Sequence, residues 1–275
     1  MDAVARVAGH FGRGGLEEKI LAALKSAGVD MERVTVEDLA PVDEFHVGGL
    51  EATKELAEQM ELGAGLRVLD VGSGIGGPAR YFAAGHGCRV TGVDLTEEFT
   101  RVATRLTKLA RLEGLVDFQC GSALGMTFEG GAFDRASLIH VGMNIADKEA
   151  LFREVRRVLK AGGLFVVFDL VRTGPGALSY PLPWALSEET SFVASGAEYR
   201  EALERAGFQL ERERGRREYS VEFTQRMLAR MAQGGPSALG LHLVVGEKMP
   251  VMIKNVLAMM KQGTLEPTEM IARAV

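Results

Sequence analysis

The sequence predicts an α/β fold in which helices cover both faces of a mostly parallel sheet. Two observations support this fold class. A short apolar run that ends in an acid is followed by a glycine-rich turn and a helical pattern, within residues 66–86. From there to residue 213, apolar runs of strand length alternate with amphipathic helical segments. Such regular alternation is typical of parallel strands that are joined by helical crossovers.

The glycine-rich turn joins the first predicted strand, residues 66–71, to the first predicted helix, residues 77–86. Glycine lets the backbone turn sharply and approach a bound ligand closely. The spacing of Gly72, Gly74 and Gly77 fits the G-x-G-x-x-G pattern of dinucleotide sites, although that pattern alone has low specificity. Three interpretations therefore stay open at this point: a dinucleotide site, a site for another nucleoside, and a turn that binds no ligand.

A carboxylate in front of the turn favours a nucleoside without phosphates. Asp70 would lie close to the anionic pyrophosphate of a dinucleotide and repel it. S-adenosylmethionine carries no phosphate, and its amine and sulfonium are cationic, so an acid at this position attracts it. We therefore expect cofactor contacts from Asp70, Gly72, Ser73 and Gly74.

The stretch VLDVGSGIGGPAR, residues 68–80, resembles motif I of the class I S-adenosylmethionine-dependent methyltransferases. Within that group it is most similar to the small-molecule "methyltransferase domain 11" and ubiquinone-biosynthesis type, over about residues 60–215. The resemblance implies a Rossmann-like, seven-stranded sheet in which residues 265–275 form an antiparallel last strand. It also implies that S-adenosylhomocysteine is the product, and that the N-terminal helices form part of a lid over cofactor and substrate.

The other elements follow from the same alternation of patterns. Helices are expected at residues 97–113, 147–159 and 198–206. The remaining strands are expected at residues 88–94, 116–120, 133–139, 164–169 and 208–213. Four arginines within residues 212–217 alternate with glutamates, which favours a solvated edge over a site for a polyanion.

Further cofactor contacts are expected where the second and third strands end. Asp94 ends the second strand, where a carboxylate can accept hydrogen bonds from the two ribose hydroxyls. Leu95 would pack on the adenine, as the resemblance also implies. The family usually has an acid for the adenine amine after the third strand, whereas this chain has Ser122. The Ser122 hydroxyl or the backbone of Ala123 would replace that acid, and a plain turn is the alternative.

Three side chains are candidates for proton transfer. His140 is the first polar side chain after the fourth strand, and the resemblance places its backbone beside the methionine part of the cofactor. Its intrinsic pKa suits a base at neutral pH, although a lone histidine is often structural. Glu44 and His46 form a second acid–imidazole candidate, because in an extended stretch both would point to one side. A capped surface loop is the alternative for that stretch.

We divide the chain into four parts. Residues 1–60 are expected to form an N-terminal helical lid, residues 61–219 the cofactor-binding core, residues 220–262 a helical cap, and residues 263–275 the last strand. The sequence of the cap predicts two helices that are separated by a break at residues 234–236. Its second helix is rich in methionine, which suits either a core or an adaptable apolar pocket. The candidate aromatic walls of the substrate pocket are Phe11, Tyr180 and Trp184.

The composition narrows the function classes. A net charge of −5 does not favour nucleic acid as a partner, and no apolar run approaches the ~20 residues that span a bilayer. The two cysteines show no metal-ligand spacing and, with the lack of a signal-peptide pattern at the N-terminus, predict a cytoplasmic protein. We expect a monomer or homodimer that methylates a small organic molecule without a metal. The alternatives are a cyclase or rearrangement catalyst that binds the cofactor without methyl transfer, and a nicotinamide-dependent oxidoreductase.

Overall fold

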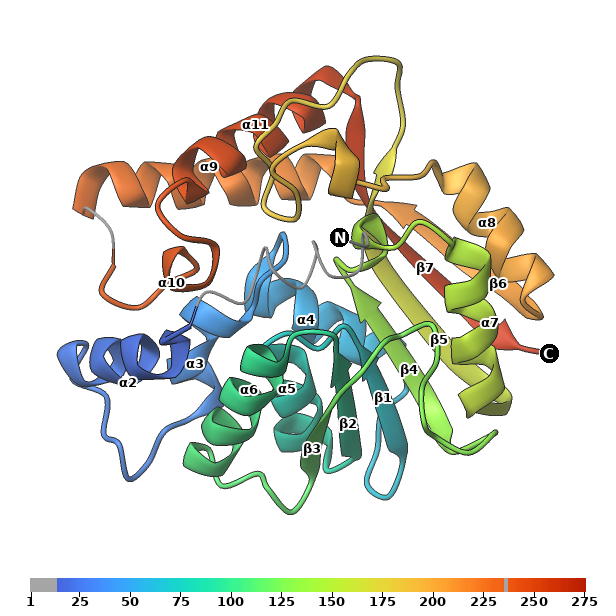
Figure 1. The fold of residues 1–275 in the computed structure, drawn as a ribbon, viewed down its shortest axis with the longest axis horizontal. Helices are drawn as coiled ribbons and strands as arrows, with labels where there is room; N and C mark the ends of the chain where they lie inside the picture. Colours follow the sequence, from blue (N-terminus) through green and yellow to red (C-terminus); the bar gives the residue numbers. More distant parts are fainter. Residues whose placement is uncertain (1–13, 235–236) are drawn as a thin grey trace.

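A seven-stranded sheet forms the centre of the protein, which is described here from a computed structural model covering residues 14–234 and 237–275 (Figure 1). The strand order is β3-β2-β1-β4-β5-β7-β6. Only β7 runs antiparallel to its neighbours, so the predicted fold class is confirmed. The strands are β1 (Arg67–Val71), β2 (Arg89–Asp94), β3 (Val116–Cys120), β4 (Phe133–Ile139), β5 (Leu159–Arg172), β6 (Phe208–Gly215) and β7 (Leu265–Ala274).

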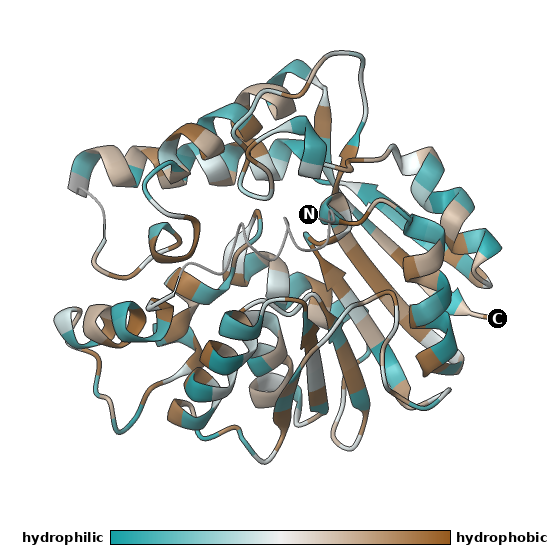
Figure 2. Ribbon diagram, in the orientation of Figure 1, coloured by the Kyte–Doolittle hydropathy of each residue, from teal (hydrophilic) through white to brown (hydrophobic). Residues whose placement is uncertain are grey.

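Helices cover both faces of the sheet. The helices α4 (Gly49–Gln59) and α5 (Gly77–His86) pack on one face, and α7 (Lys148–Val158) and α8 (Gly196–Arg205) pack on the other. Helix α6 (Glu97–Leu109) packs against β2 and β3. Figure 2 shows apolar residues concentrated in the central strands, with polar residues on the outer sides of the helices. Burial on both faces explains why these strands read as continuous apolar runs.

The remaining helices lie beyond the carboxyl ends of the parallel strands (Figure 1). They are α2 (Leu16–Ser26) and α3 (Val36–Asp43) from the N-terminal part, and α9 (Arg217–Gly234), α10 (His242–Val245) and α11 (Met249–Gln262) from the C-terminal part. A capping box between Thr35 and Asp38 begins α3. Among the described residues, no helix is both long and apolar enough to cross a bilayer.

The structure corrects several predicted boundaries. Strand β5 runs from Leu159 to Arg172, well beyond the predicted residues 164–169. Leu159 pairs with β4, and residues 164–172 pair with residues 265–273 of β7. The segment 220–262 holds a third, short helix, α10, in addition to the two that were predicted. Helix α9 begins at Arg217.

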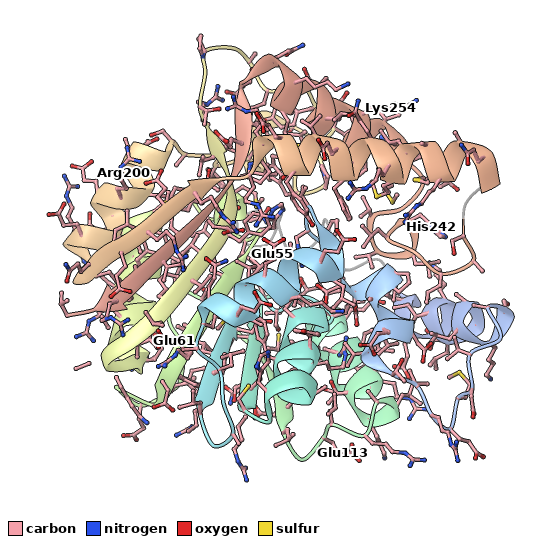
Figure 3. The ribbon with its side chains drawn as sticks, turned by 180° about the vertical axis from the view of Figure 1, so that it is seen from behind. Glu55, Glu61, Glu113, Arg200, His242 and Lys254 are labelled. Atoms are coloured by element: carbon pink, nitrogen blue, oxygen red, sulfur yellow. The ribbon has the colours of Figure 1, made fainter. Side chains whose placement is uncertain are left out.

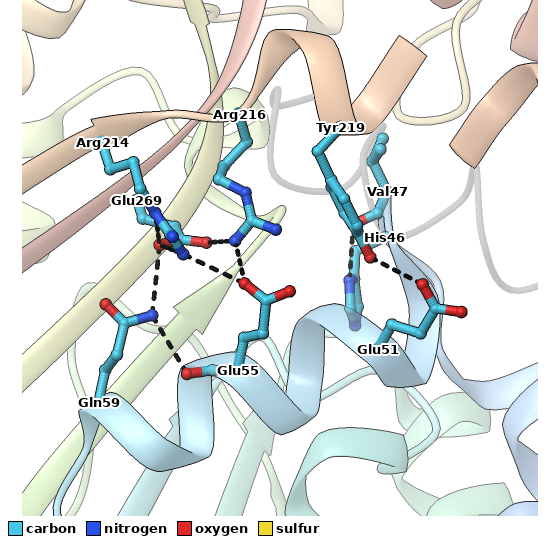
Figure 4. Close-up of polar contacts among 9 residues, drawn as sticks. All are labelled: His46, Val47, Glu51, Glu55, Gln59, Arg214, Arg216, Tyr219 and Glu269. Carbon is cyan, nitrogen blue, oxygen red and sulfur yellow. Dashed lines mark hydrogen bonds and ion pairs between the residues drawn. The ribbon is translucent and has the colours of Figure 1, made fainter. Parts of the chain in front are cut away.

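An ion network ties α4 to β6 and β7 (Figure 4). Arg216 bridges Glu55 of α4 and Glu269 of β7, and Arg214 pairs with Glu269 at 2.7 Å. Gln59 donates to Glu269 at 3.3 Å. The side chain of Arg216 is only 7% exposed, so the expectation of a solvated edge was wrong for this residue. Its charge is balanced by carboxylates that lie far away in the sequence.

Other charged side chains lie at the periphery of the molecule. Figure 3 shows Glu61, Glu113, Arg200 and Lys254 on the outside of the fold, where their side chains are exposed. Exposed charges of this kind contribute little to stability. The polar groups that could bind a ligand or take part in a reaction are therefore the buried ones at the carboxyl ends of β1, β2 and β4.

Candidate active site

The turn after β1 has a left-handed backbone at three glycines. Gly72, Gly74 and Gly76 have φ angles of 71°, 53° and 86°. A Cβ on Gly72 would lie 2.4 Å from a methyl group of Val141, and one on Gly76 would lie 2.4 Å from the ring of Phe118. A Cβ on Gly74 would meet no protein atom within 4 Å. Gly72 and Gly76 are therefore required by packing, whereas Gly74 leaves its backbone accessible to a ligand.

The carboxylate of Asp94 lies at the end of β2 and holds this turn in place. The backbone N–H of Gly74 donates to Asp94 Oδ2, and that of Thr96 donates to Oδ1, both at 2.8 Å. Burial raises the pKa of Asp94 above its ordinary value, although these N–H groups oppose the shift. Each carboxylate oxygen has more than one acceptor position, so Asp94 can still accept hydrogen bonds from a ligand. Leu95, beside it, also lines the cavity described below.

Asp70, at the end of β1, has one satisfied and one unsatisfied oxygen. Its side chain is 2% exposed, and Ser137 Oγ donates to Oδ1 at 2.8 Å. Oδ2 is buried and has no hydrogen-bond partner. Burial raises the pKa of Asp70 to about 7, and the negative charge of Glu44 adds to the shift. A cationic ligand group at Oδ2 would satisfy the oxygen and favour its ionised form.

Glu44 and His46 come together in the segment between α3 and α4. Glu44 Oε2 lies 2.8 Å from His46 Nε2 and accepts a hydrogen bond from Thr53 Oγ1 at 2.6 Å. His46 Nδ1 lies 3.3 Å from the carbonyl oxygen of Val47, as Figure 4 shows. Glu44 is 3% exposed, and its other oxygen, Oε1, is buried without a partner. The stretch is therefore a buried polar cluster, not the surface loop that was its alternative.

His140 follows β4 and lies close to this cluster. Its ring centre is 5.9 Å from that of His46 and 5.0 Å from that of Phe168. Its φ angle is 54°, in the left-handed region, and its backbone N–H donates to the carbonyl of Phe168 at 2.7 Å. Burial, followed by the proximity of His46, holds the pKa of His140 well below 6.5, so the ring is neutral at pH 7. Nε2 is buried and unpartnered.

Sequence reasoning missed the buried ion pair between Asp43 and Arg80. Both side chains are fully buried, and Arg80 Nη2 lies 2.6 Å from Asp43 Oδ2. The same guanidinium donates to the carbonyl of Ile75 in the glycine turn at 2.6 Å and to Thr107 of α6 at 3.1 Å. Arg80 thus links the glycine turn to the segment that carries Glu44 and His46. The sequence feature that could have indicated this ion pair is the arginine in the apolar helix directly after the turn.

A second missed cluster supports the loop after β4. Tyr199 of α8 donates to Asp169 Oδ2 at 2.7 Å, and both side chains are buried. A Cβ on Gly142 would lie 2.4 Å from the same oxygen, so only glycine fits there. Lys148 donates to the carbonyl of Phe192 at 2.8 Å. These contacts fix the loop that begins with His140.

A cavity of about 1130 Å³ lies at the carboxyl ends of β1, β2 and β4, under α9 and α11. All the predicted cofactor and catalytic residues line it, including Ser122 and Ala123 after β3. Trp184 lines it as well, but Tyr180 does not, and Phe11 lies outside the described residues. Several buried polar atoms without a partner belong to its lining: Asp43 Oδ1, Glu44 Oε1, Asp70 Oδ2, Ser73 Oγ, His140 Nε2 and Asn144 Oδ1.

Such buried polar atoms are rare in native proteins, and their concentration in one cavity points to a polar ligand. Within residues 14–234 and 237–275, no three His, Cys, Asp or Glu side chains gather as a metal site would need.

Comparisons with known proteins identify the central part of the chain. Residues 69–167 match a family model described as a methyltransferase domain. Methyltransferase GfsG of Streptomyces halstedii is 31% identical over 137 residues, which cover 50% of this chain and 49% of that protein. The matched region spans about half or less of the length of this and the other curated relatives.

Solved structures share the fold over nearly the whole chain. Geranyl diphosphate C-methyltransferase from Streptomyces coelicolor A3(2), in complex with Mg²⁺, geranyl diphosphate and S-adenosyl-L-homocysteine, superposes with a TM-score of 0.72 at 17% identity. The alignment covers 100% of this chain and 98% of that one. The [4+2]-cyclase SpnF superposes with a TM-score of 0.68 at 22% identity and covers 93% of both chains. These identities establish a common fold and nothing further.

Proposed function

We propose that this chain transfers a methyl group from S-adenosylmethionine to a small organic acceptor. Residues 69–167 place it in the methyltransferase domain family, among the class I S-adenosylmethionine-dependent methyltransferases. The observation that carries the proposal is the unpartnered Oδ2 of Asp70, buried in the cavity next to an accessible glycine turn. A cationic amino acid moiety without phosphates satisfies that oxygen, whereas a pyrophosphate would be repelled.

The residues of the cavity fit the cofactor in separate places. Asp70 would bind the ammonium group, and Asp94 would accept hydrogen bonds from the ribose hydroxyls while it holds Gly74. Leu95 would pack against the adenine, and Ser122 with the backbone of Ala123 would border its edge. When bound, S-adenosylmethionine supplies a methyl group on a positively charged sulfur, which is a good leaving group.

The protein contributes mainly alignment, exclusion of water and, where the acceptor needs it, removal of a proton. Our candidate for the base is His140, because its ring is neutral at pH 7 and its Nε2 has no protein partner. Glu44 is the second candidate through Oε1, and His46 would hold Glu44 in place through the contact at 2.8 Å.

We also propose the division of labour within the chain. Residues 61–219 would bind the cofactor, and residues 263–275 would complete their sheet. Residues 1–60, of which 14–60 are described, and residues 220–262 would cover the ligands, since Glu44, His46 and parts of α9 and α11 line the cavity. Closure of such segments excludes water from the reacting groups.

The proposal extends to partner and location. A net charge of −5 favours a small molecule over a nucleic acid as the acceptor. Cys88 and Cys120 are both free thiols, which suits a reducing compartment such as the cytoplasm. A monomer or homodimer would be sufficient, because all the proposed site residues come from one chain.

A second candidate function is cyclisation or rearrangement of an apolar substrate without methyl transfer, favoured by the size of the cavity. Incubation with methyl-labelled S-adenosylmethionine and a cell extract separates the two, since only a methyltransferase moves label into an extractable product. Thermal shifts with S-adenosylhomocysteine and with NAD provide the ligand control. A larger shift with NAD would contradict both candidates and favour an oxidoreductase.

A further inference from the structure

The cavity is larger than one ligand requires and has an apolar part. Its volume of about 1130 Å³ exceeds the roughly 300–1,000 Å³ of usual ligand pockets. The part away from the glycine turn lies under α9 and α11 and is lined by long apolar side chains. Those that carry the argument are Phe223, Met227 and Met231 of α9, Met249 and Ile253 of α11, and Trp184.

The charged side chains of this part are exposed. They belong to α9 and to the segment before α11, where Glu247 lines the cavity. Arg226 and Arg230 are exposed side chains one turn apart, and Arg226 lies 3.8 Å from Glu51 of α4. By contrast, Met249 and Trp184 are each 4% exposed. An acceptor therefore meets a largely apolar surface along most of its length, which disfavours compact ionic molecules.

The polar end of the cavity lacks hydrogen-bond donors for its buried acceptors. Glu44 Oε1 and Asn144 Oδ1 are buried without a partner and line the cavity, as does Nε2 of the neutral His140. Asp70 Oδ2 is accounted for by the cofactor ammonium group in the proposed function. The acceptor must then supply a hydrogen-bond donor to Glu44 Oε1, since a buried carboxylate oxygen without a donor is costly.

We propose that the methyl acceptor is a predominantly apolar alcohol, whose hydroxyl reaches the end of the cavity formed by Glu44, His140 and Asn144. This inference rests on the proposed function. The hydroxyl donates to Glu44 Oε1 in the complex. Its oxygen then forms the new bond to the methyl carbon, the electron pair of the broken sulfur–carbon bond stays on sulfur, and the hydroxyl proton passes to Glu44 Oε1. An amine suits this end less well, because the unpartnered carboxylate oxygen of Glu44 stabilises its protonated, unreactive form.

Binding of alcohol probes can be followed directly, because Trp184 is the only tryptophan and lines the cavity. The protein is first saturated with S-adenosylhomocysteine, whose affinity is measured by calorimetry. Quenching of tryptophan fluorescence is then titrated with farnesol, farnesyl methyl ether, farnesene and phosphoethanolamine. We expect farnesol to bind about tenfold or more tightly than its methyl ether, which cannot donate to Glu44.

Two variants test whether Glu44 causes the preference for farnesol over its methyl ether. In Glu44→Gln, an amide N–H₂ replaces the unpartnered oxygen, so the preference for farnesol over the ether should fall to about twofold or less. Glu58→Gln makes the same change on the exposed side of α4 and should keep the wild-type preference. Retention of S-adenosylhomocysteine affinity shows that each variant is folded, and the wild-type comparison stands even where Glu44→Gln does not fold.

The outcomes distinguish this inference from the proposed function. If S-adenosylhomocysteine does not bind, the proposed function fails. If it binds, and farnesene or the ether binds as tightly as farnesol, the alcohol class is overturned. Two further outcomes would overturn the apolar class, provided that S-adenosylhomocysteine binds. One is that phosphoethanolamine binds more tightly than all three farnesyl probes, and the other is that none of the three farnesyl probes binds.

Discussion

Replacement of Asp70 by asparagine separates the charge of this residue from its shape. Asparagine keeps an oxygen for the hydroxyl of Ser137 and places an amide at the position of the unpartnered Oδ2. In the ligand-free protein, burial raises the pKa of Asp70 to about 7, so only about 1% of it is ionised at pH 5. A cationic ligand group binds the form in which Asp70 is ionised. The apparent affinity is therefore proportional to the fraction of protein molecules in that form. Wild-type affinity for S-adenosylhomocysteine should therefore rise roughly 50–100-fold from pH 5 to pH 7.5.

The same substitution has a predicted effect on the stability of the ligand-free protein. A raised pKa means that the unfolded chain ionises Asp70 from about pH 4, whereas the folded chain does so only near pH 7. Stability is lost as pH rises through this window, and the limiting loss is roughly 4 kcal/mol, since each unit of pKa difference corresponds to about 1.4 kcal/mol. Asp70→Asn removes this loss, so it should melt at a higher temperature than wild type at pH 8 without ligand.

Two measurements check these effects together. Calorimetric titration with S-adenosylhomocysteine at pH 5, 6 and 7.5 gives the affinities, and thermal melts without ligand give the stabilities. Asp70→Asn should bind more weakly than wild type at pH 7.5 and show a nearly flat pH dependence. A variant that keeps the full wild-type pH dependence would refute the assignment, because other buried acids such as Asp43 and Asp169, with pKa values of about 6, would then account for it.

Three further predictions concern the glycine turn and its supports. Asp94→Ala should weaken S-adenosylhomocysteine binding by about 1–3 kcal/mol in calorimetry, and an unchanged affinity would contradict the ribose contact. Arg80→Met should lower the free energy of unfolding in urea by about 3–5 kcal/mol, because it leaves the Asp43 carboxylate buried without its cation; a loss below about 1 kcal/mol would contradict the linking role. Gly76→Ala should destabilise the fold in the same assay, since its Cβ would lie 2.4 Å from Phe118 and its φ is 86°; a stability equal to wild type would be inconsistent with this packing.

The elements with local patterns could be predicted from the sequence. The strand before Gly72 and the helix after it follow from an apolar run, a turn that only glycine fits and a proline in the first helical turn. The antiparallel β7 came from family resemblance. The limits of β5 could not be predicted, because its extension beyond residue 169 depends on pairing with β7, about 100 positions later in the chain.

The site could be predicted only in part, for the same reason. Asp70 and Asp94 could be found because strand ends at the carboxyl edge of a parallel sheet meet there. The link between Asp43 and Arg80 and the contact of His46 with His140 depend on how the N-terminal segment packs on the core. Arg216 could not be recognised as buried, because its carboxylate partners lie on two distant elements.

The most direct test of the account is a crystal structure of the protein with S-adenosylhomocysteine. We expect the ammonium group about 3 Å from Asp70 Oδ2, the ribose hydroxyls on Asp94, and the backbone of Gly74 against the ligand. An ammonium group placed away from Asp70, or a turn at residues 72–77 that is filled by the protein's own side chains, would contradict it.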